Sequence, residues 1–285
     1  MKDTEKKTRV FLILNCLALF VIALNLTAPV HESTHLLTQM AAGMDPYNLS
    51  FGCADTVGTA RVDLDSVFWR IMFAGSAALM NIVIGLVCFV ILRKARLGPL
   101  SRVFVLQLTL LHLCMGFGYF LRDSIAYNGS DSMGDWGKVI YLFNGSAALR
   151  IVLFILGMIG YLLALSVAYL EAYHFISDSS DKAERRQVAS AIYLIPYIFN
   201  VVVYTLLNLT SPIGIMNAII ISGILNLFGY LAFLWGYLFV GHMVKPPKES
   251  IYYFSPCAEK KPVLWIVALA LVLIDAFILC PGIYF

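Results

Sequence analysis

The fold of this chain is decided by residues 10–37, VFLILNCLALFVIALNLTAPVHESTHLL, in which a long apolar run leads directly into a histidine motif. The run from Val10 to Ala28 is about as long as a membrane-spanning helix, which needs about 20 apolar residues. Pro29 follows, and a proline inside a helix kinks or breaks it. The stretch therefore predicts a transmembrane helix that changes direction just before a group of polar side chains.

The composition extends this interpretation to the whole chain. Of its 285 residues, 60% are hydrophobic and 13% are charged, and the mean hydropathy is +0.83. Soluble domains are about 45–50% apolar and about 25% charged. The net charge of +3 is too small to indicate a nucleic-acid partner, and no patch of basic and aromatic residues indicates one either. We therefore predict a multi-pass protein whose partner is a lipid bilayer.

Apolar runs predict an all-α polytopic protein with about seven transmembrane helices. A β-prone stretch, containing Tyr47–Phe51 and Thr56–Val62, predicts a small hairpin or sheet after the first helix. Positive charges gather in alternate loops, which predicts a cytoplasmic N-terminus and puts the histidine motif toward the non-cytoplasmic half of the membrane. After the first helix, the expected spans are residues 69–92, 103–121, 147–170, 191–209, 214–240 and 263–279.

The motif at the end of the first helix is His31-Glu32-Ser33-Thr34-His35, which has the form H-E-x-x-H. Residues four apart lie on one face of a helix, so His31 and His35 can bind one zinc ion together. Glu32 can hold a water against the metal and take its proton. Ionisable groups beside membrane-spanning sequence are costly and usually functional, so the motif predicts metal-assisted hydrolysis.

A catalytic zinc ion needs a further ligand, because such sites have three protein ligands and an open position for water. The loop after the third span begins on the same side of the membrane as the histidines and offers Asp123, Asp131 and Asp135. Asp135 stands out because it opens an expected short helix, although an aspartate there can instead cap backbone N–H groups. These three residues are the candidates for the third ligand.

Two polar residues lie within other expected spans. Asn81 follows a run of small residues, 74–78, that lets helices approach closely. Asn81 either forms hydrogen bonds between helices or faces the metal site. His112 lies in the middle of the third span, and we expect it to be a hydrogen-bonded packing residue rather than a ligand.

The order and spacing of these features over residues 10–145 resemble the site-2 protease family of intramembrane zinc metalloproteases. After the H-E-x-x-H helix comes a β-like stretch that ends in Phe51-Gly52, which looks like the membrane-associated β segment of that family. Phe73-Ala74-Gly75-Ser76, continuing to Asn81, is similar to the family's Ala-Gly-Pro-x-x-Asn helix, with the proline absent.

The loop after the third span extends the resemblance. Asn128 and Asp135 stand where the family has an Asn followed by an Asp-Gly whose Asp is the third zinc ligand. Trp136 replaces the glycine here, so Asp131 stays an alternative to Asp135. By this resemblance, Asn81 or Asn128 is expected to hydrogen-bond the substrate backbone or the oxyanion.

The resemblance implies hydrolysis of peptide bonds within or beside the membrane, on a core of three helices surrounded by further helices. Residues 1–145 would form this core, and residues 146–285 would supply the additional helices. The substrate would be a membrane protein or peptide that must unwind, because an intact helix shields its own carbonyls. The stretch 47–62 would bind the unwound segment as an added strand.

Two rival groups of functions fit the same residues, one enzymatic and one not. Another class of membrane zinc protease takes its third ligand from a later glutamate, for which Glu171 is available, although charge counting places it on the opposite side from the histidines. An inactive relative could instead act as a membrane scaffold or receptor, or a transporter could carry a metal bound by the histidines. Glu32 separates these from an enzyme, because neither needs a catalytic base.

Overall fold

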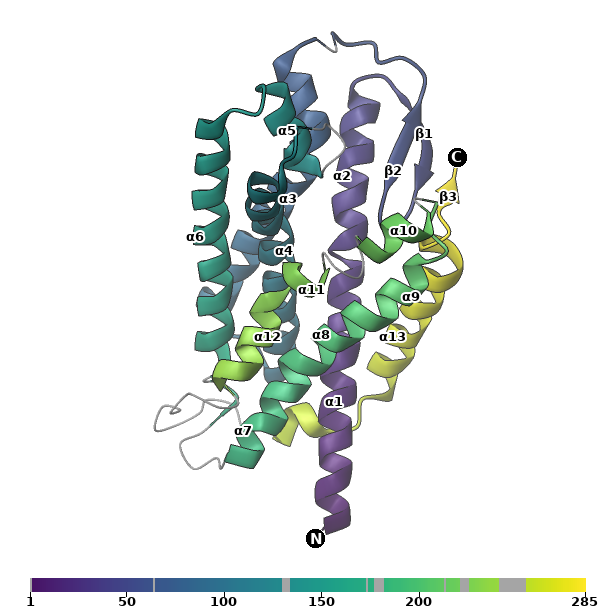
Figure 1. Ribbon diagram of the computed structural model, residues 1–285. Coiled ribbons are helices and arrows are strands. Elements are labelled where there is room, and N and C mark those ends of the chain that lie inside the picture. The colour runs from purple at the N-terminus through teal and green to yellow at the C-terminus, as the bar shows by residue number, and fades with distance from the viewer. Residues whose placement is uncertain are drawn as a thin grey trace.

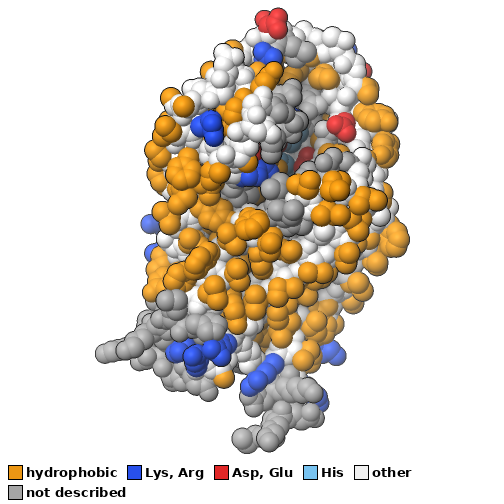
Figure 2. All heavy atoms as spheres, viewed as in Figure 1, with side chains coloured by type: hydrophobic (Ala, Val, Ile, Leu, Met, Phe, Trp, Pro, Cys, Tyr) orange, Lys and Arg blue, Asp and Glu red, His pale blue; other side chains and the backbone are white. Residues whose placement is uncertain are grey.

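The computed structural model describes residues 2–63, 65–129, 134–172, 174–176, 182–212, 214–220, 226–240 and 255–285. Within these residues the chain is mostly helical, and the longest helices run along a common axis (Figure 1). Hydrophobic side chains cover the middle of the face seen in Figure 2, and Lys and Arg side chains lie near its lower end. In the described part of the chain, six helical stretches are long and apolar enough to cross a membrane: Lys7–Ala41, Val67–Lys94, Pro99–Ala126, Ala147–Ala172, Lys182–Asn208 and Pro262–Leu279. These features are those of a multi-pass membrane protein.

The first apolar run forms two helices separated by a turn. Helix α1 (Lys2–Asn25) ends just before the turn at residues 26–27, and α2 (Ala28–Ala41) begins directly after it. Pro29 lies in the first turn of α2, where a proline is tolerated because the N–H that it lacks would have no helical partner. The predicted break before the motif is confirmed, and the motif begins at the fourth residue of α2.

A small antiparallel sheet follows α2. Strands β1 (Asp45–Leu49) and β2 (Ala54–Val57) form the predicted hairpin, and β3 (Ile283–Tyr284) pairs with the other edge of β1. The strand order is β2-β1-β3, and Figure 1 shows the sheet beside α2. The hydroxyl of Thr56 on β2 donates to Oε1 of Gln39 on α2 at 2.6 Å. The sequence did not predict β3, because two residues after an apolar run carry no strand pattern.

Three long helices pack together beside α2, and α3 packs against it. Helices α3 (Val67–Lys94) and α6 (Ala147–Ala172) both pack against α4 (Pro99–Ala126), and the short helix α5 (Asp135–Leu142) contacts α3 and α4. The close approach of α3 and α4 requires a glycine: a Cβ at Gly116 would lie 2.8 Å from the carbonyl oxygen of Ala78.

The structure departs from the sequence prediction over residues 214–240, which were expected to form the sixth of seven spans. Within the described residues, six helices have the length and apolarity of a span, and this segment is not one of them. Residues 221–225 lie outside the described part of the chain. The described pieces of the segment are α10 (Ile215–Ala218), α11 (Asn226–Gly229) and α12 (Leu231–Leu238). The prediction of seven spans is therefore not confirmed.

The break between α11 and α12 is stabilised by a side chain from α6. The hydroxyl of Tyr161 donates to the carbonyl of Gly229 and accepts from the N–H of Leu231 at 3.2 Å. Within a membrane, a backbone group freed by a helix break must find a partner inside the protein. Tyr161 supplies that partner, which explains how the interruption is tolerated.

The remaining elements complete the bundle, and α1 packs against the last of its long helices. Because β3 joins the sheet that follows α2, the C-terminal part contributes to the fold of the N-terminal part. The proposed division at residues 145 and 146 stays a prediction. These elements are α7 (Lys182–Ala189), η1 (Ser190–Leu194), α8 (Ile195–Phe199), η2 (Asn200–Tyr204), α9 (Thr205–Asn208), η5 (Ser255–Ala258), α13 (Pro262–Ile274) and η6 (Asp275–Leu279).

Candidate metal centre

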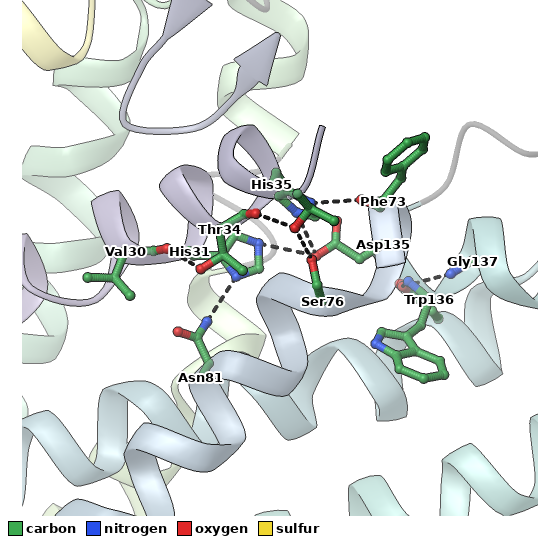
Figure 3. Close-up of polar contacts among 12 residues, drawn as sticks. Val30, His31, Thr34, His35, Phe73, Ser76, Asn81, Asp135, Trp136 and Gly137 are labelled. Atoms are coloured by element: carbon green, nitrogen blue, oxygen red, sulfur yellow. Dashed lines mark hydrogen bonds and ion pairs between the residues drawn. The ribbon is translucent and has the colours of Figure 1, made fainter. Parts of the chain in front are cut away.

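Three predicted ligands converge at one point between α2, α3 and α5. His31 and His35 project from the same face of α2, and Asp135, the first residue of α5, points toward both (Figure 3). Nε2 of each histidine lies 3.2 Å from Oδ2 of Asp135. One ligand atom from each of the three residues lies within 4.8 Å of the others. The structure thus brings together residues separated by about a hundred positions in the chain.

These distances fit a single small cation. Zinc binds imidazole nitrogen and carboxylate oxygen at about 2.0–2.2 Å, so two ligand atoms on one tetrahedral ion lie about 3.3 Å apart. The separations of 3.2 Å between the histidine nitrogens and Asp135 match this value. Two imidazoles and one carboxylate, all borderline or hard donors, also suit zinc chemically. His31, His35 and Asp135 could therefore hold a zinc ion.

Both His35 and Asp135 are prepared for this role by their neighbours. Nδ1 of His35 donates to the carbonyl of Phe73 on α3 at 3.0 Å, which leaves Nε2 facing the centre. Burial by itself would raise the pKa of Asp135, but its interactions with His31 and His35 outweigh burial and hold this pKa well below its usual value. Asp135 is therefore a carboxylate at neutral pH, the form that binds a cation.

Asp135 is positioned by another aspartate, Asp123 at the end of α4. Oδ2 of Asp123 accepts from the backbone N–H groups of Trp136 and Gly137, in the first turn of α5, at 2.9 and 3.0 Å. The other oxygen of Asp123 accepts from Nε of Arg122 at 2.5 Å. Asp123 thus caps α5 and is not a member of the ligand group, and Asp135 is free of the capping role that its position allowed.

Gly134, which precedes Asp135, is required by the same arrangement. Its φ of +64° is a left-handed conformation that favours glycine, and a Cβ there would collide with the side chains of Arg122 and Asp123. Only a residue without a side chain lets the loop lie directly on this ion pair. The alternative ligand Asp131 lies outside the described residues.

Asp123→Ala is expected to weaken zinc binding by about 10-fold, in the range found for residues that orient metal ligands. The substitution removes the cap of α5 and leaves Arg122 without its partner, so Asp135 loses its fixed position. Zinc affinity would be measured by competition with a chelating dye. Asp123→Asn is the matched control: its side-chain oxygen can still accept from α5, so it should lose less affinity than Asp123→Ala. Equal losses in both variants would contradict this role.

Glu32 lies beside the ligands without joining them. Its side chain is 8% exposed, and it directly follows His31 on α2. Figure 2 shows a hollow in the upper half of the viewed face in which histidine, acidic and basic side chains lie together. Glu32 is therefore a largely buried carboxylate that stands next to a candidate ligand in the chain.

Of the two asparagines predicted to bind substrate, only Asn81 is seen at the centre. It is fully buried, and its amide lies between Nδ1 of His31, at 2.9 Å, and Nδ1 of His112, at 3.0 Å. Asn81 thus both joins helices and contacts a predicted ligand, and His112 is the hydrogen-bonded residue expected from the sequence. Asn128 lies exposed in the loop after α4, and its role stays a prediction.

Two residues at the centre were missed by sequence reasoning. The ring of Tyr119 stacks on that of His31, with centroids 5.1 Å apart and planes 9° apart. The guanidinium carbon of Arg122 lies 4.4 Å from the centroid of the Tyr119 ring. A signal for Tyr119 was present, because His112, Tyr119 and Asp123 recur at helical spacing on one face of an apolar helix. Polar residues repeated in this way within a membrane span indicate a face turned toward a site.

Glu171, the third ligand of the rival type of zinc protease, is engaged elsewhere. Its buried carboxylate accepts from Nε of Arg102 at 2.7 Å, and Arg93 lies 4.0 Å away. In the described part of the chain, the ligand group formed with the two histidines contains Asp135 and not Glu171. No family model, curated protein or solved structure matches this chain.

Proposed function

We propose that this protein is an intramembrane zinc metalloprotease that resembles the site-2 protease family and hydrolyses peptide bonds of membrane-associated substrates. One observation carries the proposal: His31, His35 and Asp135 place three ligand atoms within 4.8 Å of one another, with Glu32 beside them. Metal-assisted hydrolysis requires a metal ion and a base that takes a proton from its bound water, and a metal centre with an adjacent buried carboxylate provides both. A scaffold or a metal transporter has no need of that carboxylate.

In the proposed reaction, three side chains hold the metal and a fourth transfers a proton. His31, His35 and Asp135 hold the ion; when bound, zinc supplies a Lewis acid that lowers the pKa of water to about 7. Glu32 accepts the proton from the attacking water and passes it to the leaving amine. Tyr119, stacked on His31, keeps the plane of that ring fixed.

The sheet beside α2 gives the proposed substrate a place to bind in extended form. In the order β2-β1-β3, strand β1 has partners on both sides, so an added strand would pair with an outer strand. Strand β2 is the candidate, because Thr56 on this strand donates to Gln39, which lies one turn after His35 on α2. A helical substrate would unwind before it binds there, exposing carbonyls that its own hydrogen bonds had covered.

The positive charges of alternate loops support a cytoplasmic N-terminus, with the metal centre toward the non-cytoplasmic half of the membrane. Substrates would then be membrane proteins or peptides cut near that surface. We infer no nucleic-acid partner, because the net charge is only +3.

The test of this proposal is metal analysis of the purified full chain together with a cleavage assay. We expect about one zinc per chain, as one set of three ligands predicts. We also expect cleavage of some single-span membrane substrates reconstituted in the same vesicles. A chelator should abolish cleavage, and added zinc should restore it. A protein that holds zinc but cleaves none of a broad substrate panel would favour the scaffold or transporter, and one that binds no zinc would remove the basis of the proposal.

A further inference from the structure

A row of buried polar side chains leads from the metal centre into the middle of the helix bundle. Nδ1 of His31 lies 2.9 Å from the amide nitrogen of Asn81 on α3, and the amide oxygen of Asn81 lies 3.0 Å from Nδ1 of His112 on α4. All three residues are at most 1% exposed. Hydrolysis as proposed uses His31 and gives no role to His112.

The amide between two imidazoles determines which nitrogen of each ring carries the proton. With the amide nitrogen facing His31, Nδ1 of that ring accepts, so its proton is on Nε2, 3.2 Å from the carboxylate of Asp135. The amide oxygen accepts in turn from Nδ1–H of His112. In the absence of a metal ion, this arrangement gives the Asn81 amide one hydrogen bond to each imidazole.

Binding of a metal ion requires the opposite arrangement at His31. Nε2 must offer its lone pair to the ion, so the proton must lie on Nδ1, which becomes a donor. A half-turn of the Asn81 amide exchanges its oxygen and nitrogen at nearly the same positions. The oxygen then accepts from His31, and the nitrogen donates to Nδ1 of His112. His112 must now carry its proton on Nε2, and both rings stay neutral throughout.

We propose that His112 is a positioning residue of the metal centre, which acts through Asn81 to hold His31 in the tautomer that binds metal. The inference rests on the proposed function for its metal ion, and it assigns Asn81 to the support of a ligand instead of to the substrate. If His112 could not accept a hydrogen bond, the turned amide of Asn81 would leave a buried N–H group without a partner. His31 would then be held in the tautomer that faces Asp135 with a proton.

Zinc affinity of the full chain in detergent, measured by dye competition without substrate, tests this inference. His112→Leu and Asn81→Leu are each expected to raise the zinc Kd by about 10- to 100-fold. The double variant should raise it by about as much as one substitution alone, because both break the same row of hydrogen bonds. His112→Gln should recover most of the affinity, because its amide can both accept and donate.

The matched control is Gln107→Leu, at another buried amide on α4. Gln107 donates to the backbone carbonyls of Cys16 and Ile192 at 3.1 and 3.2 Å, away from the ligands. This variant should lower thermal stability and leave the zinc Kd unchanged. An unchanged zinc Kd in His112→Leu would overturn the inference. The inference would also be overturned if the fold-increase in zinc Kd of the double variant equalled the product of the two single fold-increases.

A second measurement needs no substitution. ¹⁵N spectra of the unaltered protein labelled at histidine report which ring nitrogen is protonated, with and without zinc. We expect the proton of His112 to move from Nδ1 to Nε2 when zinc binds, and an unchanged tautomer would overturn the inference. Failure of the proposed function would look different: the unaltered protein would bind no zinc, or would bind it and cleave nothing while the zinc-linked change at His112 persisted.

Discussion

Glu32→Gln should abolish peptide hydrolysis and leave zinc bound. Glutamine keeps the size of the side chain but cannot accept a proton from water, so general base catalysis and proton transfer to the leaving amine are lost together. Each such role is worth about 10²- to 10⁴-fold in rate, and we expect a loss of at least about 10³-fold in kcat. Zinc should stay bound because Glu32 is not among the three ligand residues.

The measurement is a single-turnover cleavage assay beside zinc analysis of the same preparation. Glu259→Gln is the matched control, because it makes the same chemical change at an exposed side chain that pairs with Lys261 at 2.7 Å. It should alter neither zinc content nor cleavage. Hydrolysis at the normal rate in Glu32→Gln would show that another group acts as base and would remove Glu32 from the mechanism.

The second large effect is expected at Asp135. Asp135→Asn removes the charge of a predicted ligand with little change in shape, and we expect the zinc Kd to rise by more than about 100-fold, beyond the range seen when only an outer partner of a ligand is lost. Cleavage should be lost with the metal. The hydrogen bonds that hold the pKa of Asp135 below its usual value indicate that the charged form is the one the site accommodates.

Glu171→Gln is the comparison that separates Asp135 from its rival. Glu171 is buried against Arg102, so this variant should lose thermal stability and keep zinc. The reverse pattern, with zinc retained in Asp135→Asn and lost in Glu171→Gln, would support the class of membrane protease that takes its third ligand from a glutamate. Zinc retained in both variants would point to Asp131 as the ligand.

Much of the fold could be predicted because its signals are local. The length of the first apolar run, the break before Pro29 and the hairpin after α2 all follow from neighbouring residues, and the structure confirms them. The segment 214–240 was harder, because its apolar composition resembles that of a continuous span. The hydroxyl of Tyr161, about seventy residues earlier in the chain, stabilises the break at Gly229. No pattern of neighbouring residues predicts such a contact.

Hydropathy and helical period are properties of consecutive residues, so the membrane-spanning character of the chain and the shared face of His31 and His35 followed from the sequence alone. Only the tertiary structure decided that Asp135 reaches those histidines on a helix capped by Asp123, and that Asn81 connects one of them to His112. Contacts between distant segments depend on how helices pack against one another. Packing depends on complementary surfaces formed by several segments together, so no single segment of the chain predicts it.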